Sequence, residues 1–328
     1  MKLSNLGKSN IEIPKLSLGC ANFGGIGSVA SLIGKGNNRN EAFEIMNHSF
    51  DLGMFHFDTS CSYADGLSEQ YIGDWIKNKG SNIRQDLVIA TKVGLKIGDP
   101  PKLAGLGDFQ IRKSIEKSLL RLQTDYIDIF YAHCLDPNIP QETLIESFNT
   151  LKIEGKIRHF AVCNVDNLDL NKSIKYSDDS LNSNYLAVQN SFSLIDRSSE
   201  KEIMKKCHNH NIAFIGHSPL FGGLLCGSYD QNWKSNKNIR LNLRPDYYKS
   251  LLNNEQHKKI SELKAISKEL NIDMVTLNYL WLMGHPLLTS SLIAPRTVKH
   301  FDAIKNAVSI DSLNLEVWEK ISNNFNIE

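Results

Sequence analysis

The stretch FHFDTSCSYADGLSEQYIGDWIKNKGSNIRQDLVIATKVG (residues 55–94) predicts a strand, a helix and a second strand. Its two ends, FHFDTS and LVIATKVG, are apolar and rich in β-branched and aromatic residues, whereas SEQYIGDWIKNK between them repeats its apolar residues every three or four positions. A buried parallel strand is apolar along most of its length, so a polar residue at its end stands out. Asp58 and Lys92 occupy such positions, which makes both of them candidates for function.

The same alternation of strands and helices continues along the chain in both directions. The strand candidates are 15–20, 54–60, 86–93, 126–134, 156–164, 185–192, 212–220 and 289–295. The stretches with helical periodicity are 41–53, 68–79, 111–122, 142–155, 201–211 and 254–270. Eight strands that alternate with helices across one undivided chain favour a closed (β/α)8 TIM barrel over an open doubly wound sheet.

We therefore predict a single α/β barrel domain over residues 1–328. Long loops are expected after the first strand, at residues 22–40, and after the seventh strand, at residues 221–252. Such barrels carry their functional sites on the loops that follow the strands. Phe23, Phe221 and Trp233 lie on these two loops and are candidates for an apolar wall of a substrate pocket.

The composition excludes several classes of partner and site. With a net charge of +1 over 328 residues, the chain has no general electrostatic attraction for nucleic acid or for an anionic membrane. No apolar run approaches membrane-spanning length, and the N-terminus lacks the pattern of a signal peptide, so we expect a cytoplasmic protein. The six cysteines form no CxxC pair and are expected to be free thiols.

Two further polar residues complete a group that can donate a proton. Tyr63 follows Asp58 by five residues, and His133 ends the apolar run IDIFYAHC. A tyrosine has a pKa near 10, and a cation at about 4 Å favours its phenolate by roughly 4 kcal/mol, although burial acts the other way. Lys92 can supply that cation, Asp58 can keep it charged, and His133 can orient a substrate oxygen. The four residues predict a polarised general acid.

These segments resemble the signatures of the aldo-keto reductases, which are NAD(P)H-dependent barrel enzymes. FDTSCSYADGLSEQYIGDWI (57–76) is similar to the family segment that carries the aspartate and the tyrosine, and IATKVG and YAHCLD are similar to the next two. The resemblance implies reduction of an aldehyde or ketone, with Tyr63 as proton donor. It also implies that Lys92 and Asp58 tune Tyr63, that His133 orients the carbonyl, and that the cofactor delivers hydride to the carbonyl carbon.

The resemblance also implies a nicotinamide site. Cys163, Asn164 and Gln189 correspond to the residues that hold the carboxamide beside Asp58, and Cys163 stands where a serine is common. His217 stands where the family often has a tyrosine that stacks on the nicotinamide.

The remaining cofactor positions concern its phosphates. The resemblance places backbone groups of Ser218, Leu220 and Gly222 at the phosphates, and it favours NADPH over NADH because Arg296 can pair with a 2′-phosphate. Ala294 and Ile304 depart from the family pattern nearby, where glycine and asparagine are usual.

Each of these interpretations has an alternative. Asp58 and Lys92 could form a structural ion pair, and Arg296 could be a surface charge at the start of a helix. GIGSVA (25–30) imitates a dinucleotide fingerprint but is expected to be a loop, because glycines interrupt any helix after it. Cys207, His208 and His210 are expected to form a solvated helix end, so no metal site is predicted.

The alternative function is a cofactor-binding regulatory subunit, like the potassium-channel β-subunits that share the barrel and the four residues. Such a protein would have little turnover.

Overall fold

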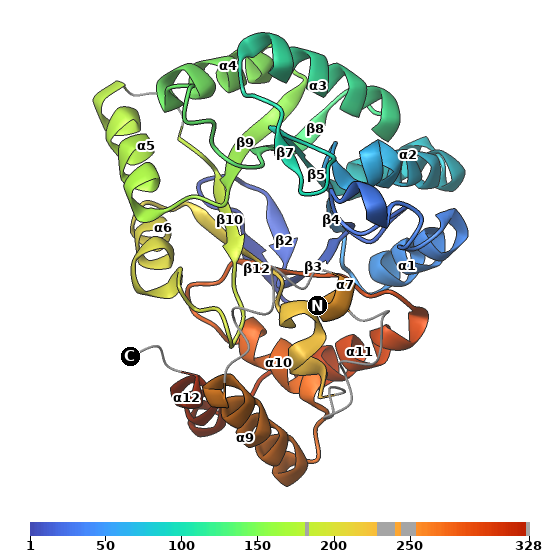
Figure 1. Cartoon of the computed structure of the whole chain (residues 1–328), viewed down its shortest axis with the longest axis vertical. Coiled ribbons are helices and arrows are strands. Elements are labelled where there is room, and N and C mark those ends of the chain that lie inside the picture. The colour runs from blue at the N-terminus through green and yellow to red at the C-terminus, as the bar shows by residue number, and fades with distance from the viewer. Residues whose placement is uncertain (181–183, 228–239, 244–253, 326–328) are drawn as a thin grey trace.

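The computed structural model describes residues 1–180, 184–227, 240–243 and 254–325, and within them eight parallel strands close into a barrel surrounded by helices (Figure 1). Around the barrel the strands follow one another in chain order, and the last pairs with the first. They are β3 (Leu16–Gly19), β4 (His56–Asp58), β5 (Val88–Val93), β8 (Ile127–Ala132), β9 (Ile157–Cys163), β10 (Ala187–Ser191), β11 (Ala213–His217) and β12 (Ser290–Ile293). Each lies within a predicted strand segment, so the predicted (β/α)8 fold is confirmed.

The side chains of each strand alternate between the barrel interior and the surrounding helices. On β5, Val88 and Ala90 pack with the residues that fill the interior, whereas Ile89 and Val93 pack in the larger core under the helices. This period of two continues to Lys92, which therefore points into the barrel at its C-terminal end. The alternation is the reason why a charged residue can end an otherwise apolar strand.

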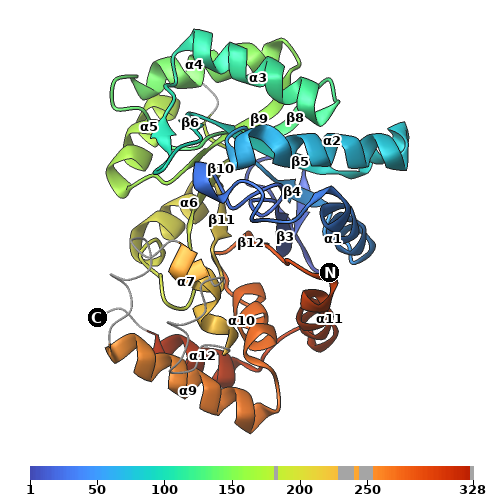
Figure 2. The same cartoon turned by 45° about the vertical axis from the view of Figure 1, so that its right-hand side comes forward.

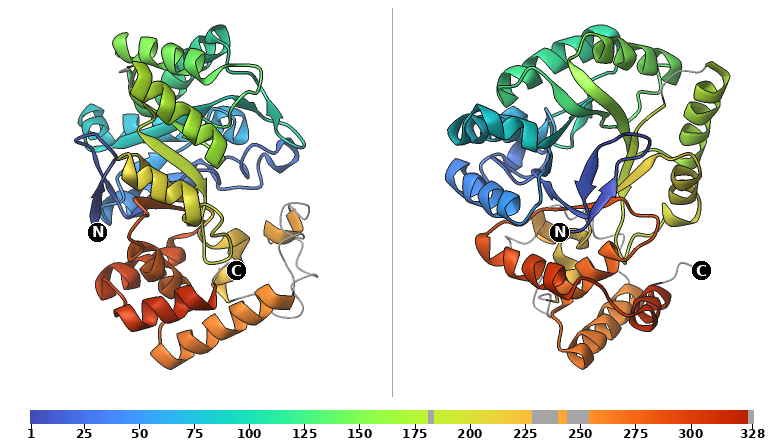
Figure 3. Two further views of the ribbon diagram at one scale, coloured as in Figure 1. Left: turned by 90° about the vertical axis from the view of Figure 1, so that its left-hand side faces the viewer. Right: turned by 180° about the vertical axis from the view of Figure 1, so that it is seen from behind.

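A hairpin closes the opposite, N-terminal end of the barrel. Its strands are β1 (Leu3–Asn5) and β2 (Glu12–Pro14), and Figure 3 shows them lying across the barrel when it is seen from behind. Leu6 and Ile13 of this hairpin are fully buried among the interior residues. The barrel is thus filled by side chains and has its functional end at the C-terminal side of the strands.

The helices form the outer layer, and those predicted from periodicity are present. The helices are α1 (Arg39–Asp51), α2 (Leu67–Lys79), α3 (Asp108–Leu122), α4 (Gln141–Ile153), α5 (Asn167–Ser180), α6 (Lys205–Asn209), α7 (Arg240–Leu243), α9 (Asn254–Leu270), α10 (Met274–Met283), α11 (Phe301–Ile310) and α12 (Leu315–Asn324). Figure 2 shows α9 to α12 gathered on the side of the barrel near β12. No described helix combines the length and apolar character needed to cross a membrane.

Five helices, α5, α7, α10, α11 and α12, are not among the predicted ones. In α10 nearly every side chain is buried, so its sequence MVTLNYLWLM has no polar face that would reveal helical periodicity. The helix packs against α11 and α9, and the ring of Trp281 stacks on Trp318 of α12 with centroids 6.0 Å apart. Because α10 is in contact with its neighbours on all sides, its sequence has no apolar periodicity from which a helix could be predicted.

The loop after β3 has little regular secondary structure. Residues 20–38 connect β3 to α1 and contain only the short 3-10 helix η1 (Ala30–Leu32), so GIGSVA is not followed by a long helix. A small hairpin after β5, formed by β6 (Leu95–Lys96) and β7 (Lys102–Leu103), is joined to this loop because Ser31 donates two hydrogen bonds to Asp99.

The segment predicted as a loop after β11 is described only at η5 (Phe221–Cys226) and α7. Trp233 lies outside the described residues.

Candidate active site

The buried centre of the site is an ion pair between Lys92 of β5 and Asp58 of β4. The Lys92 ammonium donates to the Asp58 carboxylate and, at 2.9 Å, to the main-chain oxygen of Thr59. The two side chains are 0% and 3% exposed, so neither charge is solvated by bulk water. The other carboxylate oxygen of Asp58 accepts from Gln189 Nε2 of β10 at 2.8 Å. Three strands therefore contribute to one hydrogen-bonded group inside the mouth of the barrel.

Tyr63 lies directly beside this ion pair. It begins the 3-10 turn η2 (Tyr63–Gly66) after β4, and its ring centre is 5.3 Å from Lys92 Nζ. The loop after β3 supports the turn, since Ala64 N donates to Gly27 O at 2.9 Å. A Cβ atom at Gly25 would come within 2.9 Å of the Cβ of Ala64, so only glycine lets the loop approach this closely.

His133 completes the predicted group of four. Its ring is nearly perpendicular to that of Tyr63, with centroids 5.7 Å apart. The residue is 8% exposed, and its Nδ1 lies 3.1 Å from the hydroxyl of Ser60. Burial, with smaller effects of Lys92 and His217, holds the pKa of His133 well below its usual value, so the ring is neutral near pH 7. The structure thus brings all four predicted residues together at one face.

Burial and neighbouring charges shift the pKa values of Tyr63 and Lys92 in opposite directions. Although Tyr63 keeps some exposed surface, protein atoms surround it so densely that burial raises its pKa to about 12, while Lys92 acts to lower it. For Lys92, burial acts to lower the pKa, but Asp58 and Tyr63 raise it above its usual value. Lys92 therefore stays charged, whereas burial outweighs its effect on the phenol.

A second hydrogen-bonded group links the ends of β9 and β11. Asn164 Nδ2 donates to the main-chain oxygen of His133 at 2.9 Å, and Asn164 Oδ1 lies 3.4 Å from His217 Nε2. His217 Nδ1 lies 3.1 Å from Ser218 Oγ, so these contacts fit the tautomer in which Nε2 carries the hydrogen. Burial is the main cause that lowers the pKa of His217 to about 4, so this ring is also neutral near pH 7.

The other residues predicted near the cofactor lie at the same end of the barrel. Cys163, 1% exposed, ends β9, and burial raises the pKa of its thiol. Leu220 is half-buried, and Gly222 has a φ of +67°, a left-handed conformation that glycine adopts without strain.

The prediction that Phe23 and Phe221 form an apolar wall of a substrate pocket is wrong. Phe23 and Phe221 are each 1% exposed and pack in the main core, which leaves them almost no surface to offer a substrate.

Arg296 lies apart from the ion pair, at a cavity of about 330 Å³ beyond the end of β12. Asn37, Thr297 and His300 also line the cavity. The loop after β3 forms part of its wall, because Asn37 Nδ2 donates to the main-chain oxygen of Arg296 at 2.8 Å. Ile304, where the family usually has asparagine, is fully buried and offers no polar group to this cavity.

Comparison with known proteins assigns the family. The model of the aldo/keto reductase family matches residues 15–324. The chain belongs to the aldo/keto reductase family. It is an NAD(P)H-dependent oxidoreductase, and its membership of this family supports carbonyl reduction as its general reaction.

Individual members of the family cover nearly the whole chain. The chain is 30% identical to the uncharacterised oxidoreductase YrpG of Bacillus subtilis, over 99% of this chain and 96% of YrpG. It is 26% identical to an aryl-alcohol dehydrogenase of Pestalotiopsis microspora, over 93% and 76% of the two chains. It is 25% identical to L-glyceraldehyde 3-phosphate reductase of Escherichia coli, over 97% and 90%.

Sequence reasoning missed two features of this aldo/keto reductase site. Tyr131 is fully buried inside the barrel, and Lys92 Nζ is 5.6 Å from its ring centre, so the ammonium lies near two phenol rings. Tyr131 precedes His133 by two residues, so the alternation of side chains along a strand predicts that both point to the same side. This was the signal from which the position of Tyr131 inside the barrel could have been inferred.

The second missed feature is an ionic support behind β5. Glu69 is fully buried, accepts from Thr91 Oγ1 at 2.5 Å and from Arg121 Nε at 2.6 Å, and so fixes the outer face of the strand that carries Lys92.

Proposed function

We propose that this protein reduces an aldehyde or ketone to the alcohol with NADPH, and that Tyr63 donates the proton. The proposal depends chiefly on one observation, the buried Lys92–Asp58 pair whose ammonium lies 5.3 Å from the centre of the Tyr63 ring. A fixed positive charge beside a phenol stabilises the phenolate that remains after proton transfer.

Each of the four residues has a separate task in this proposal. As negative charge develops on the carbonyl oxygen, Tyr63 Oη gives up its proton, and Lys92 stabilises the charge left on the phenol. Asp58 keeps Lys92 protonated in the barrel interior. His133 is neutral, and a hydrogen bond from Ser60 to Nδ1 would leave Nε2 protonated and able to donate to the substrate oxygen.

The residues of the mouth fit a nicotinamide cofactor. When bound, NADPH supplies the hydride. Gln189 and Asn164 carry amide groups suited to a carboxamide, with Asp58 and Cys163 beside them. His217, held by Asn164 and Ser218, offers an imidazole face to the ring.

The phosphates have their own proposed partners. Ser218, Leu220 and Gly222 can bind the diphosphate through main-chain groups, because Ser218 and Gly222 have positive φ and redirect the backbone here. Arg296 can pair with the 2′-phosphate at its cavity, which is why we propose NADPH rather than NADH.

The experiment that tests the proposed function is a carbonyl panel followed through NADPH absorbance, with NADH in parallel. The panel contains aromatic aldehydes, methylglyoxal and keto sugars. Tyr63→Phe should lower kcat by about 10²- to 10⁴-fold, the usual contribution of a general acid, while NADPH still quenches tryptophan fluorescence. Tyr126→Phe, which changes a tyrosine that is not part of the site, serves as the control. Full activity in Tyr63→Phe would refute the assigned proton donor.

A further inference from the structure

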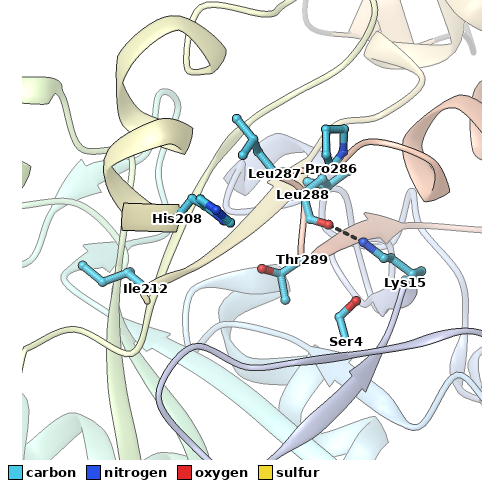
Figure 4. A pocket seen from close by; sticks show the side chains of 8 residues that line it. All are labelled: Ser4, Lys15, His208, Ile212, Pro286, Leu287, Leu288 and Thr289. Atoms are coloured by element: carbon cyan, nitrogen blue, oxygen red, sulfur yellow. Dashed lines mark hydrogen bonds between the residues drawn. The ribbon is translucent and has the colours of Figure 1, made fainter. Parts of the chain in front are cut away.

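A second cavity lies at the opposite end of the barrel from Lys92 and has no part in the proposed reaction. It has a volume of about 170 Å³ and opens between the N-terminal hairpin, the end of α6 and the segment before β12 (Figure 4). Its lining residues are Ser4, Lys15, His208, Ile212, Pro286, Leu287, Leu288 and Thr289. Lys15, Ile212 and Thr289 directly precede β3, β11 and β12, which places the cavity at the N-terminal ends of these strands.

The polar groups of this cavity are hydrogen-bond donors. Lys15 Nζ donates one hydrogen bond to the main-chain oxygen of Leu288 at 2.6 Å, and an ammonium has two further hydrogens to offer. Thr289 Oγ1 accepts from Phe214 N at 3.1 Å, so its own hydrogen is available for a different acceptor. The hydroxyl of Ser4 and the ring of His208 also line the cavity.

The charge of Lys15 is not balanced within the cavity. Among the described lining residues none is acidic, and the neighbouring charge is the ammonium of Lys2, which is paired with Asp311 at 2.9 Å. Burial, followed by repulsion from Lys2, lowers the pKa of Lys15. A partly desolvated ammonium with no acidic residue among the described residues that line its cavity, and with hydroxyl donors around it, has the properties of an anion site.

We propose that this cavity binds a small phosphate-type oxyanion through Lys15, with Ser4, Thr289 and His208 as additional donors. The ion supplies the missing counter-charge and accepts the hydrogen bonds that Lys15 and the hydroxyls can donate. Because the cavity is formed by the hairpin and by the segments before β11 and β12, its occupant ties the hairpin to the barrel. Binding to the folded state alone raises stability by mass action.

The test is thermal unfolding of the full chain in increasing inorganic phosphate, with potassium chloride at matched ionic strength. We expect a saturable rise in Tm of a few degrees that Lys15→Gln abolishes. Lys8→Gln, an exposed lysine on the same hairpin, should keep the rise. The comparison is repeated in the Arg296→Gln background, so that the proposed 2′-phosphate position contributes nothing to it. A rise that survives in Lys15→Gln, or that chloride reproduces, would mean an adventitious ion only and would overturn the proposal.

Two further measurements cover the case in which Lys15→Gln does not fold. Calorimetry in two buffers of different ionisation enthalpy should show proton uptake on phosphate binding at alkaline pH, because the anion restores the charge of Lys15. His208→Gln, an exposed substitution, should weaken binding severalfold. Phosphate binding with neither effect would also overturn the proposal. Glycerol phosphate in place of inorganic phosphate distinguishes a phosphate ester from the free ion.

Discussion

Lys92 and Asp58 form an ion pair that is almost completely shielded from solvent inside the barrel. A buried pair of this kind is costly to break because the remaining charge has neither water nor a partner. Asp58→Asn should therefore lower the free energy of unfolding by about 3–5 kcal/mol, measured by urea denaturation. The double variant Asp58→Asn/Lys92→Met, which has no unpaired ammonium, should be more stable than Asp58→Asn alone. Additive losses in the double variant would show that the two side chains are not coupled.

The phenol of Tyr63 should titrate at unusually high pH in the cofactor-free protein. Burial raises its pKa to about 12, so the group stays protonated through the range in which exposed tyrosines ionise near 10. The tyrosinate absorbance of wild type minus that of Tyr63→Phe should show no ionisation below about pH 10. Because Lys92 acts to lower this pKa, Lys92→Met should move the titration still higher. A difference signal well below pH 10 would contradict the effect of burial.

Arg296 should decide the preference between the two coenzymes. A charge-assisted contact contributes about 1.5–3 kcal/mol, so Arg296→Gln should raise the KM for NADPH by roughly 10- to 100-fold. The KM for NADH, which lacks the 2′-phosphate, should change little. Lys299→Gln, a neighbouring charge that does not line the cavity, is the matched control. Equal losses with both coenzymes in Arg296→Gln would remove the arginine from 2′-phosphate recognition.

Glu200 should make the stability of the protein sensitive to acid. Although burial acts to raise the pKa of Glu200, hydrogen bonds from His285 and Arg197 bring it down to about 2. Arg197 Nη2 donates to this carboxylate at 2.7 Å. Because the folded-state pKa is depressed, the stabilisation is complete above the ordinary value of 4.5 and is lost as pH falls toward 2.

Glu200→Gln tests this dependence. The variant should be less stable than wild type by about 2 kcal/mol at pH 7, and the two should converge as pH falls from 5 to about 2. Urea denaturation across this range measures the difference. A gap of constant size would mean that the charge of Glu200 does not contribute.

The sequence by itself determined the barrel and the residues at its mouth. The eight strands could be predicted because each is a short apolar, β-rich run bounded by turn residues, and strand ends in a parallel barrel must share one face. A charged residue such as Lys92 at the end of an apolar run is conspicuous without any structure. The order of Asp58, Tyr63, Lys92 and His133 along the chain then indicated the family, which the comparison confirmed.

Only the tertiary structure decided which groups meet and how strongly burial acts on them. From the sequence we expect Lys92 to lower the pKa of Tyr63 strongly. In the structure the dense packing around the phenol makes desolvation the larger effect, and the pKa rises. The helix α10 is buried on all sides, so its sequence lacks the periodicity by which a helix is recognised. Phe23, predicted on a substrate-covering loop, lies in the core instead. The cavity beside Lys15 joins segments from both ends of the chain. Contacts between distant segments depend on packing, and a local pattern of residues cannot specify them.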